Sequence, residues 1–132
     1  MTKVFLGGPC NDSDWRDKLI SLLEPTVYYF DPRVEDWNEE AQKREIEERR
    51  TCNYCLYVIT PKMTGVYSIA EVIDDSNKRP QKTIFCYLES DGDSSFSEGQ
   101  LRSLYNVKKM VERNSSHTFS TLVEIADFLN EM

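Results

Sequence analysis

The chain has 132 residues, of which 39% are hydrophobic and 30% charged, and its 16 Lys and Arg against 23 Asp and Glu give a net charge of −7. This length fits a single domain over residues 1–132, and the composition excludes disordered and fibrous proteins. The acidic balance argues against nucleic acid as a partner, and no segment has the ~20 consecutive apolar residues of a membrane-spanning helix, so no membrane association is expected.

Localisation and cysteine chemistry follow from the same overview. Residues 1–9 lack the long apolar core of a signal peptide, so we expect a cytoplasmic protein with reduced cysteines. The Cys52-x-x-Cys55 spacing is found in metal and redox sites, but no second pair accompanies it and Cys55 lies within an apolar run. We therefore expect buried thiols, and neither a metal nor a cofactor.

Short apolar runs alternate with amphipathic segments along the chain. In order, we expect a strand at 4–6, a helix at 12–24, a strand at 26–30, a helix at 39–50, a strand at 54–59, a helix at 67–77, a strand at 83–88, a loop at 89–97, a helix at 98–113, a short strand at 118–119 and a helix at 122–129. The candidate N-caps are Asn11, Asp12 or Ser13 for the first helix, Asn38 for the second, and Thr121, in a capping box with Glu124, for the last.

This alternation predicts the fold. The runs at 54–59 and 83–88 are apolar throughout, as in strands covered on both faces, which indicates a mostly parallel sheet. We expect a single-domain doubly wound (flavodoxin-like) α/β fold with about five strands and helices on both faces. Such folds bind ligands at the carboxyl ends of their strands, which points to 7–12, 31–37 and 60–71.

Two of these segments carry candidate binding residues. Gly7 and Gly8 allow a ligand close to the backbone, and the helix that follows can offer N–H groups to an anion or a sugar hydroxyl, although a tight turn without a ligand is equally compatible. Asp31 can bind sugar hydroxyls and Arg33 a phosphate or carboxylate, although an Asp-Pro turn at the surface is the commoner outcome.

The third segment holds Glu71, which lies near the start of the helix expected at 67–77, with Ser68 just before it. A carboxylate in the first turn of a helix stays ionised because the helix dipole favours its charge. That suits a nucleophile attacking an anomeric carbon, whereas the simpler interpretation is a glutamate that stabilises the helix end.

Several segments together resemble the nucleoside 2-deoxyribosyltransferase-like proteins. The resemblance runs through Val4 to Pro9, Asp31 to Arg33 with Asp36-Trp37, the acidic helix leading into 54–60, Ser68 to Glu71, and Phe119 to Leu122. It implies a small doubly wound α/β protein, a homo-oligomer, that cleaves or exchanges the N-glycosidic bond of a 2-deoxyribonucleoside or its monophosphate.

The resemblance also implies roles for particular residues. Glu71 falls on the nucleophile that forms a covalent 2-deoxyribosyl intermediate. Glu45, or Glu47 as a near alternative, falls where the family has an Asp that serves the base or its protonation.

Binding roles follow in the same way. Ser68 falls in the stretch that holds the sugar or phosphate, and Asn106 falls where a neighbouring subunit contributes a carboxamide. Phe5 stands where the family has a tyrosine near the nucleophile, and Gly65 stands where the transferases have an Asp. These two departures keep an alternative open, a catalytically inactive module of the same fold that binds or senses a nucleotide-like ligand.

Overall fold

The strands and helices follow the predicted alternation. The computed structural model describes residues 2–9, 12–34 and 36–131, so Cys10 and the candidate cap Asn11 lie outside the described residues. The strands of the main sheet are β1 (Thr2–Gly7), β2 (Val27–Phe30), β3 (Tyr54–Ile59), β4 (Thr83–Tyr87) and β7 (His117–Phe119). The helices are α1 (Trp15–Leu22), α2 (Glu39–Thr51), α3 (Tyr67–Lys78), the 3-10 turn η1 (Pro80–Lys82), α4 (Glu98–Arg113) and α5 (Leu122–Asn130).

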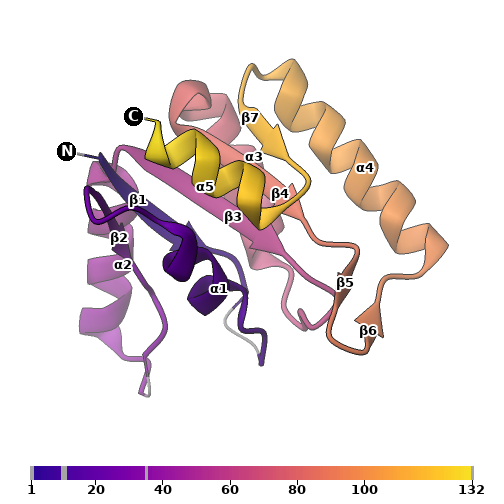
Figure 1. The fold of residues 1–132 in the computed structure, drawn as a ribbon, viewed down its shortest axis with the longest axis horizontal. Helices are drawn as coiled ribbons and strands as arrows, with labels where there is room; N and C mark the ends of the chain where they lie inside the picture. Colours follow the sequence, from indigo (N-terminus) through magenta and orange to yellow (C-terminus); the bar gives the residue numbers. More distant parts are fainter. Residues whose placement is uncertain (1, 10–11, 35, 132) are drawn as a thin grey trace.

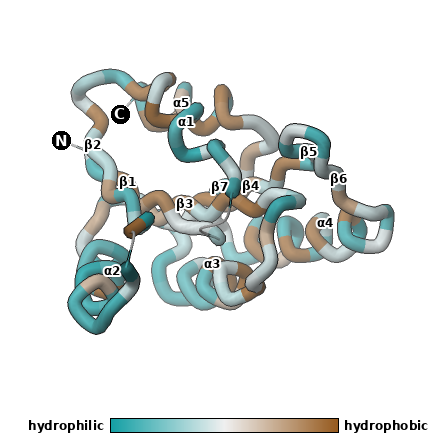
Figure 2. The backbone as a smooth tube through the Cα atoms, turned by 90° about the horizontal axis from the view of Figure 1, so that it is seen from below, coloured by the Kyte–Doolittle hydropathy of each residue, from teal (hydrophilic) through white to brown (hydrophobic). Residues whose placement is uncertain are grey.

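The five strands form one parallel sheet in the order β2-β1-β3-β4-β7. The sheet lies between two layers of helices, with α1 and α5 over one face and α2, α3 and α4 over the other (Figures 1 and 2). This confirms the doubly wound, flavodoxin-like architecture expected from the sequence. The direction of the connections changes between β1 and β3, so this is the switch point at which such sheets bind ligands.

Successive side chains of β1 supply both hydrophobic cores. Val4 and Leu6 pack with α1 and α5, whereas Phe5 packs with α3 and α4 on the opposite face. This alternation is the period of two that a strand imposes on its side chains. Because both faces are covered, the strand sequences are continuously apolar, which is why they could be recognised without any polar-apolar alternation.

The predicted first helix differs from the observed one at both ends. It begins at Trp15, because residues 12–14 are not helical and the buried Ser13 hydroxyl oxygen accepts a hydrogen bond from the Trp15 N–H at 3.3 Å. The N-cap residue is Asp14, whose side chain makes no capping hydrogen bond. The helix ends at Leu22 because Leu23 is already extended.

The other two predicted caps form. The Asn38 side chain accepts from the Ala41 N–H at 2.8 Å, and the Thr121 hydroxyl accepts from the Glu124 N–H at 3.2 Å. The reciprocal half of the predicted box is shifted by one residue, because the Glu124 carboxylate accepts from the Ser120 N–H rather than from that of Thr121.

The segment predicted as a loop at 89–97 contains a small antiparallel hairpin. Its strands are β5 (Ser90–Asp91) and β6 (Ser94–Ser95), and Gly92 takes a positive φ of 61° in the two-residue turn between them. The strands are too short and too polar to show a strand pattern in the sequence, so only the Gly-Asp turn marks them.

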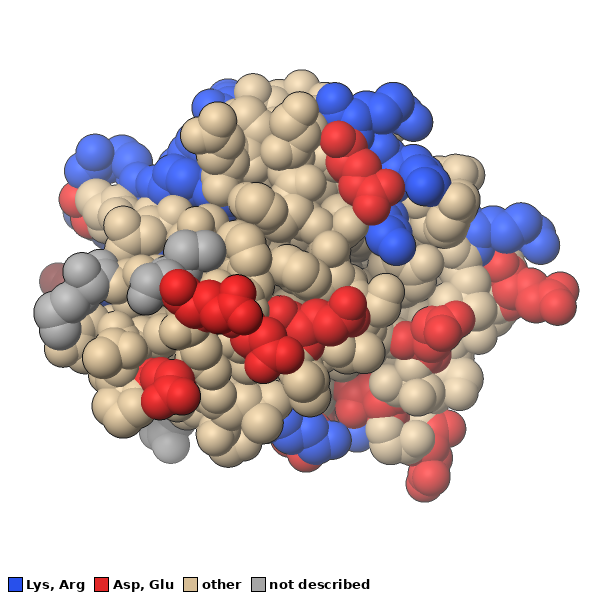
Figure 3. All heavy atoms as spheres, turned by 45° about the horizontal axis from the view of Figure 1, so that its top comes forward, with Lys and Arg blue, Asp and Glu red and all other residues tan. Residues whose placement is uncertain are grey.

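The surface is acidic, as the net charge indicates, and the described cysteines are buried. Acidic side chains gather in the middle of the face that Figure 3 presents. Among the described residues, Cys52, Cys55 and Cys86 are free and buried, and burial raises the pKa of Cys55 to about 12. The helices within the described ranges include none with the length and apolar character needed to cross a membrane.

The end of β1 depends on glycine at two successive positions. A Cβ on Gly7 would lie 2.8 Å from the Tyr57 ring, and a Cβ on Gly8 would fall against the backbone oxygen of Val58. Gly8 also has a φ of 126°, a conformation that L side chains rarely adopt. The close approach of β1 to β3 therefore requires both glycines.

We predict that Gly8→Ala lowers the free energy of unfolding by about 1–3 kcal/mol or more, because it adds backbone strain and a clash with Val58. The matched control is Gly65→Ala, since a Cβ there meets no atom within 4 Å. Urea denaturation of both variants measures the difference. Equal stability of the two variants would contradict the close packing of β1 on β3.

Candidate active site

A cavity of about 360 Å³ lies at the carboxyl ends of β1 and β2, between α2 and α3. Its volume is within the range of small-molecule sites. Six residues singled out in the sequence line it together, namely Phe5, Gly7, Gly8, Glu45, Ser68 and Glu71. The sequence analysis assigned no role to the other side chains that line it, chiefly Trp37, Gln42, Ile46, Arg49 and Tyr67.

A buried arginine on the opposite face of the sheet hydrogen-bonds the turn whose glycines line the cavity. Arg16 of α1 is 1% exposed, and its guanidinium donates hydrogen bonds to the carbonyl oxygens of Leu6 at 3.0 Å, Gly8 at 2.8 Å and Pro9 at 3.3 Å. These bonds neutralise the polarity of the turn that follows β1 and hold it in place. The glycine backbone is thereby presented to the cavity in one conformation.

The helix α3 begins at Tyr67, as expected, but Glu71 is its fifth residue and therefore lies in the second turn, not in the first turn as predicted. The helix dipole acts mainly within the first turn, so the expectation that it keeps Glu71 ionised is wrong. The side chain is 22% exposed, and burial raises its pKa. Arg49 opposes this rise, whereas the nearby carboxylate of Glu45 adds to it.

Arg49 of α2 is the main residue that the sequence analysis left unassigned. Its Nη1 lies 3.7 Å from Oε2 of Glu71, and its Nε and Nη2 donate to the two carboxylate oxygens of Asp75 at 3.1 and 2.9 Å. In the sequence, Arg49 shows only as a cation in the last turn of a helix. Its position four residues after Glu45 places both on one helix face, and that spacing is the signal that could have found it.

The mouth of the cavity carries two exposed aromatic side chains. Trp37 and Tyr67 are 61% and 74% exposed, although both line the cavity. Ser68 lies below them as the second residue of α3 and is buried. The side chain of the N-cap residue, Val66, makes no capping hydrogen bond at this helix end. Backbone N–H groups in the first turn of α3 are therefore suited to a sugar hydroxyl.

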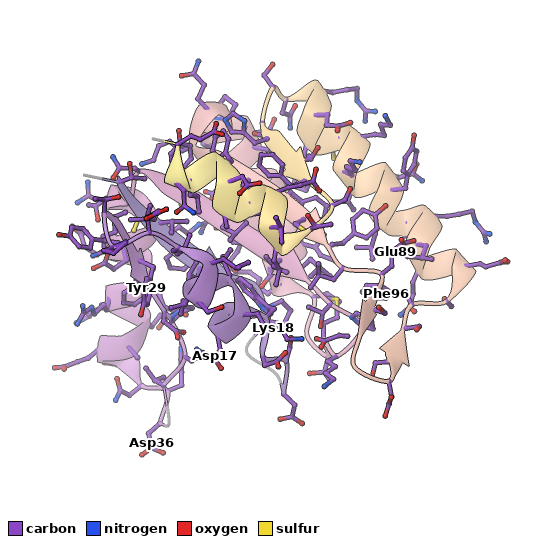
Figure 4. The ribbon with its side chains drawn as sticks, in the orientation of Figure 1. Asp17, Lys18, Tyr29, Asp36, Glu89 and Phe96 are labelled. Carbon is purple, nitrogen blue, oxygen red and sulfur yellow. The ribbon has the colours of Figure 1, made fainter. Side chains whose placement is uncertain are left out.

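The structure does not bring Asp31 and Arg33 into this cavity. Arg33 donates to Asp31 through Nε at 3.0 Å and to Asp17 through Nη2 at 2.8 Å. Asp17 projects from α1 (Figure 4), and the hydrogen bond from Arg33 holds the pKa of Asp17 below its usual range. Asp31 lines a neighbouring cavity that shares Glu45 with the first. The roles of Asp31 and Arg33 stay predictions.

Three further residues also lie elsewhere. Glu47 is exposed and pairs with Arg50 at 2.7 Å. Asn106 of α4 lines a separate, shallow cavity. Asp36 points away from the body of the protein, at the tip of the segment before α2 (Figure 4).

Across the described ranges, no three His, Cys, Asp or Glu side chains gather as a metal site requires.

Comparison with known proteins adds one match. The model of the family described as nucleoside 2-deoxyribosyltransferase like matches residues 1–90. No curated protein and no solved structure matches the chain. The matched range runs from β1 through β4 and includes every residue that lines the cavity, whereas Asn106 lies beyond it. Because the match covers more than half of the sequence, the chain belongs to the nucleoside 2-deoxyribosyltransferase-like family.

Proposed function

We propose that the protein cleaves or exchanges the N-glycosidic bond of a 2-deoxyribonucleoside or its monophosphate, with Glu71 as the nucleophile. The observation that carries this proposal is that Glu71, Glu45 and the Gly7-Gly8 backbone line one cavity at the switch point of the sheet. The family match over the same residues supports it.

In the proposed reaction, the Glu71 carboxylate attacks the anomeric carbon of the sugar. The bond from this carbon to the base nitrogen breaks, and its electron pair leaves with the base. A carboxylic acid at Glu45 gives the base a proton, so that a neutral base departs. Water or a second base then attacks the same carbon, gives a proton to the Glu45 carboxylate and releases the Glu71 carboxylate, so both side chains return to their starting states.

The geometry favours Glu45 over Glu47 as the proton donor. Glu45 lines the cavity and affects the pKa of Glu71, which indicates that the two carboxyl groups sense each other's charge. A carboxyl group that faces the same cavity as the nucleophile is within reach of a base that leaves from that cavity. Glu47 instead points to solvent and pairs with Arg50.

The aromatic rings at the mouth are suited to the base. Trp37 precedes α2 and Tyr67 begins α3, so the two rings belong to opposite walls of the cavity. Exposed aromatic rings that line a pocket offer stacking surfaces to a planar ligand. A nucleoside whose sugar lies at Glu71 would place its base toward this mouth.

A second candidate is a module that binds a nucleoside without cleaving it. Phe5 favours it, because this residue lines the cavity without the hydroxyl that a tyrosine would offer to Glu71. Chromatography of mixtures with 2-deoxyribonucleosides, their monophosphates and free bases separates the two functions. Base release indicates the enzyme, and binding without release indicates the module.

We predict that Glu71→Gln reduces base release to the uncatalysed level, because an amide cannot act as the nucleophile. Burial raises the pKa of Glu71 in the folded state, so the stability linked to this group is present at low pH and is lost as the pH rises through that pKa. At neutral pH the free energy of unfolding of the variant should therefore equal or exceed that of the wild type. The exposed Glu40→Gln is the control, and full activity of Glu71→Gln would refute the mechanism.

The pH dependence gives a second prediction. The nucleophile must be ionised, so kcat/KM should rise with pH through the pKa of Glu71. Because burial raises this pKa above the ordinary value of 4.5, the acidic limb should lie at a higher pH than that of an unperturbed glutamate. A profile that stays flat down to about pH 4 in folded protein would be the contrary result.

Tryptophan fluorescence tests the position of the base. Trp15, the first residue of α1, is 1% exposed in the core, whereas Trp37 is 61% exposed at the cavity. We predict that 2-deoxyribonucleosides quench the emission of the wild type, that free 2-deoxyribose does not, and that Trp37→Phe loses the quenching. Equal quenching in Trp37→Phe, after correction for absorbance by the nucleoside, would place the base elsewhere.

A further inference from the structure

Three acidic residues of α3 and one arginine of α2 form a connected cluster that reaches the wall of the cavity. Glu71, Asp74 and Asp75 lie three and four positions apart, so they share one face of the helix. The Arg49 guanidinium contacts all three, at 3.7 Å from Glu71, 3.2 Å from Asp74 and 2.9 Å from Asp75. Its Nη2 also lies 3.4 Å from the backbone oxygen of Glu71.

Asp75 fixes the orientation of this guanidinium. Its side chain is 0% exposed, and its two oxygens accept the Nε and Nη2 hydrogen bonds of Arg49. The same carboxylate accepts from the Tyr57 hydroxyl at 2.5 Å and from Arg79. A planar guanidinium that is held at two nitrogens has no freedom left to rotate, so Nη1 is directed toward Glu71.

Apart from Arg49, the described groups around Glu71 offer no positive charge. From β1, Phe5 supplies an apolar ring, and from β3 the Tyr57 hydroxyl is already bonded to Asp75. From α2 the neighbouring charges are Glu45 and Arg49, and from α3 itself the neighbouring charge is that of Asp75. Within the described residues, Arg49 is the cation paired with Glu71.

We propose that Arg49 is a positioning residue, whose guanidinium spans Asp75 and Glu71 and holds the Glu71 carboxylate ionised and directed into the cavity. It thereby takes the place of the hydroxyl that Phe5 lacks. The kinetic consequence rests on the proposed function, whereas the effect on the ionisation of Glu71 does not.

The test compares two arginines that share Asp75. Arg49→Gln removes the charge beside Glu71, and Asp75 keeps Arg79 and Tyr57 as partners. Arg79→Gln removes an equal charge from Asp75 but leaves the Arg49–Glu71 pair intact. The titration of Glu71 is followed by NMR of its side-chain carboxyl group, which Glu71→Gln identifies, and circular dichroism checks the fold.

We predict that Arg49→Gln moves the titration of Glu71 to higher pH, so that the ionised fraction on the acidic limb falls about tenfold or more, whereas Arg79→Gln leaves it in place. An unchanged titration in Arg49→Gln, or an equal change in both variants, overturns the proposal. If Arg49→Gln does not fold, Arg49→Lys replaces it, because a single ammonium group keeps the charge but cannot span both carboxylates. Wild-type titration in Arg49→Lys would then overturn the proposal.

Kinetics separates this inference from the proposed function. If the wild type releases base, Arg49→Gln should lower kcat with little change in KM and shift the acidic limb to higher pH, and Arg49→Lys should restore part of kcat. If the wild type releases no base but the NMR titration shifts as predicted, the proposed chemistry fails and the role of Arg49 stands. A shift in KM alone would indicate that Arg49 contacts the ligand, which contradicts a positioning role.

Discussion

The buried carboxylate of Asp75 is the constraint on which the candidate site depends. A charge with no exposure to water is strongly destabilising unless it is paired and hydrogen-bonded. Asp75 meets this requirement with Arg79 from its own helix end, Tyr57 from β3 and Arg49 from α2. Because α2 has no buried residue of its own, this polar anchor, rather than an apolar face, holds α2 against α3. The space that it leaves open between the two helices is the cavity.

The opposite wall of the cavity is set by backbone rather than by charge. Gly7 and Gly8 let β1 approach β3 more closely than any side chain would permit, and Arg16 fixes their carbonyl oxygens from the far face of the sheet. Hydrogen bonds hold both walls in the absence of a ligand, from Arg16 on the turn after β1 and from Asp75 on Arg49. Such pre-organisation suits the positioning that the proposed displacement at an anomeric carbon requires.

The sequence predicted the fold almost completely because the fold depends on local, periodic signals. Continuous apolar runs at β3 and β4 and the capped helix after Asn38 are recognisable without knowing what packs against them. The site was predicted less fully, because its members meet only through tertiary contacts. Glu71 could be found beside a strand end, but its charge environment depends on Arg49, which comes from 22 residues earlier in the chain.

Arg33 shows the same limit for a residue that the sequence analysis did select. As a cation at a strand end it was a reasonable phosphate ligand, yet Asp31 and Asp17 take up its guanidinium. The pair with Asp31, two residues away, could have been expected from sequence alone. The pair with Asp17 could not, because it depends on how α1 packs beside β2. An arginine near a predicted site is therefore informative only once its acidic neighbours are known.

The charge on Glu71 is difficult to explain by stability alone. Burial, Glu45 and Asp75 all disfavour its ionised form, and among the described residues only Arg49 offsets them. A neutral side chain at this position would avoid that conflict and would fill the same wall, so the carboxyl group is of the kind that functional sites retain at the expense of stability. A module that only binds sugar hydroxyls gains nothing from a charge there that an amide could not supply. A nucleophile needs the charge itself, and for this reason the environment of Glu71 supports the proposed cleavage rather than binding alone.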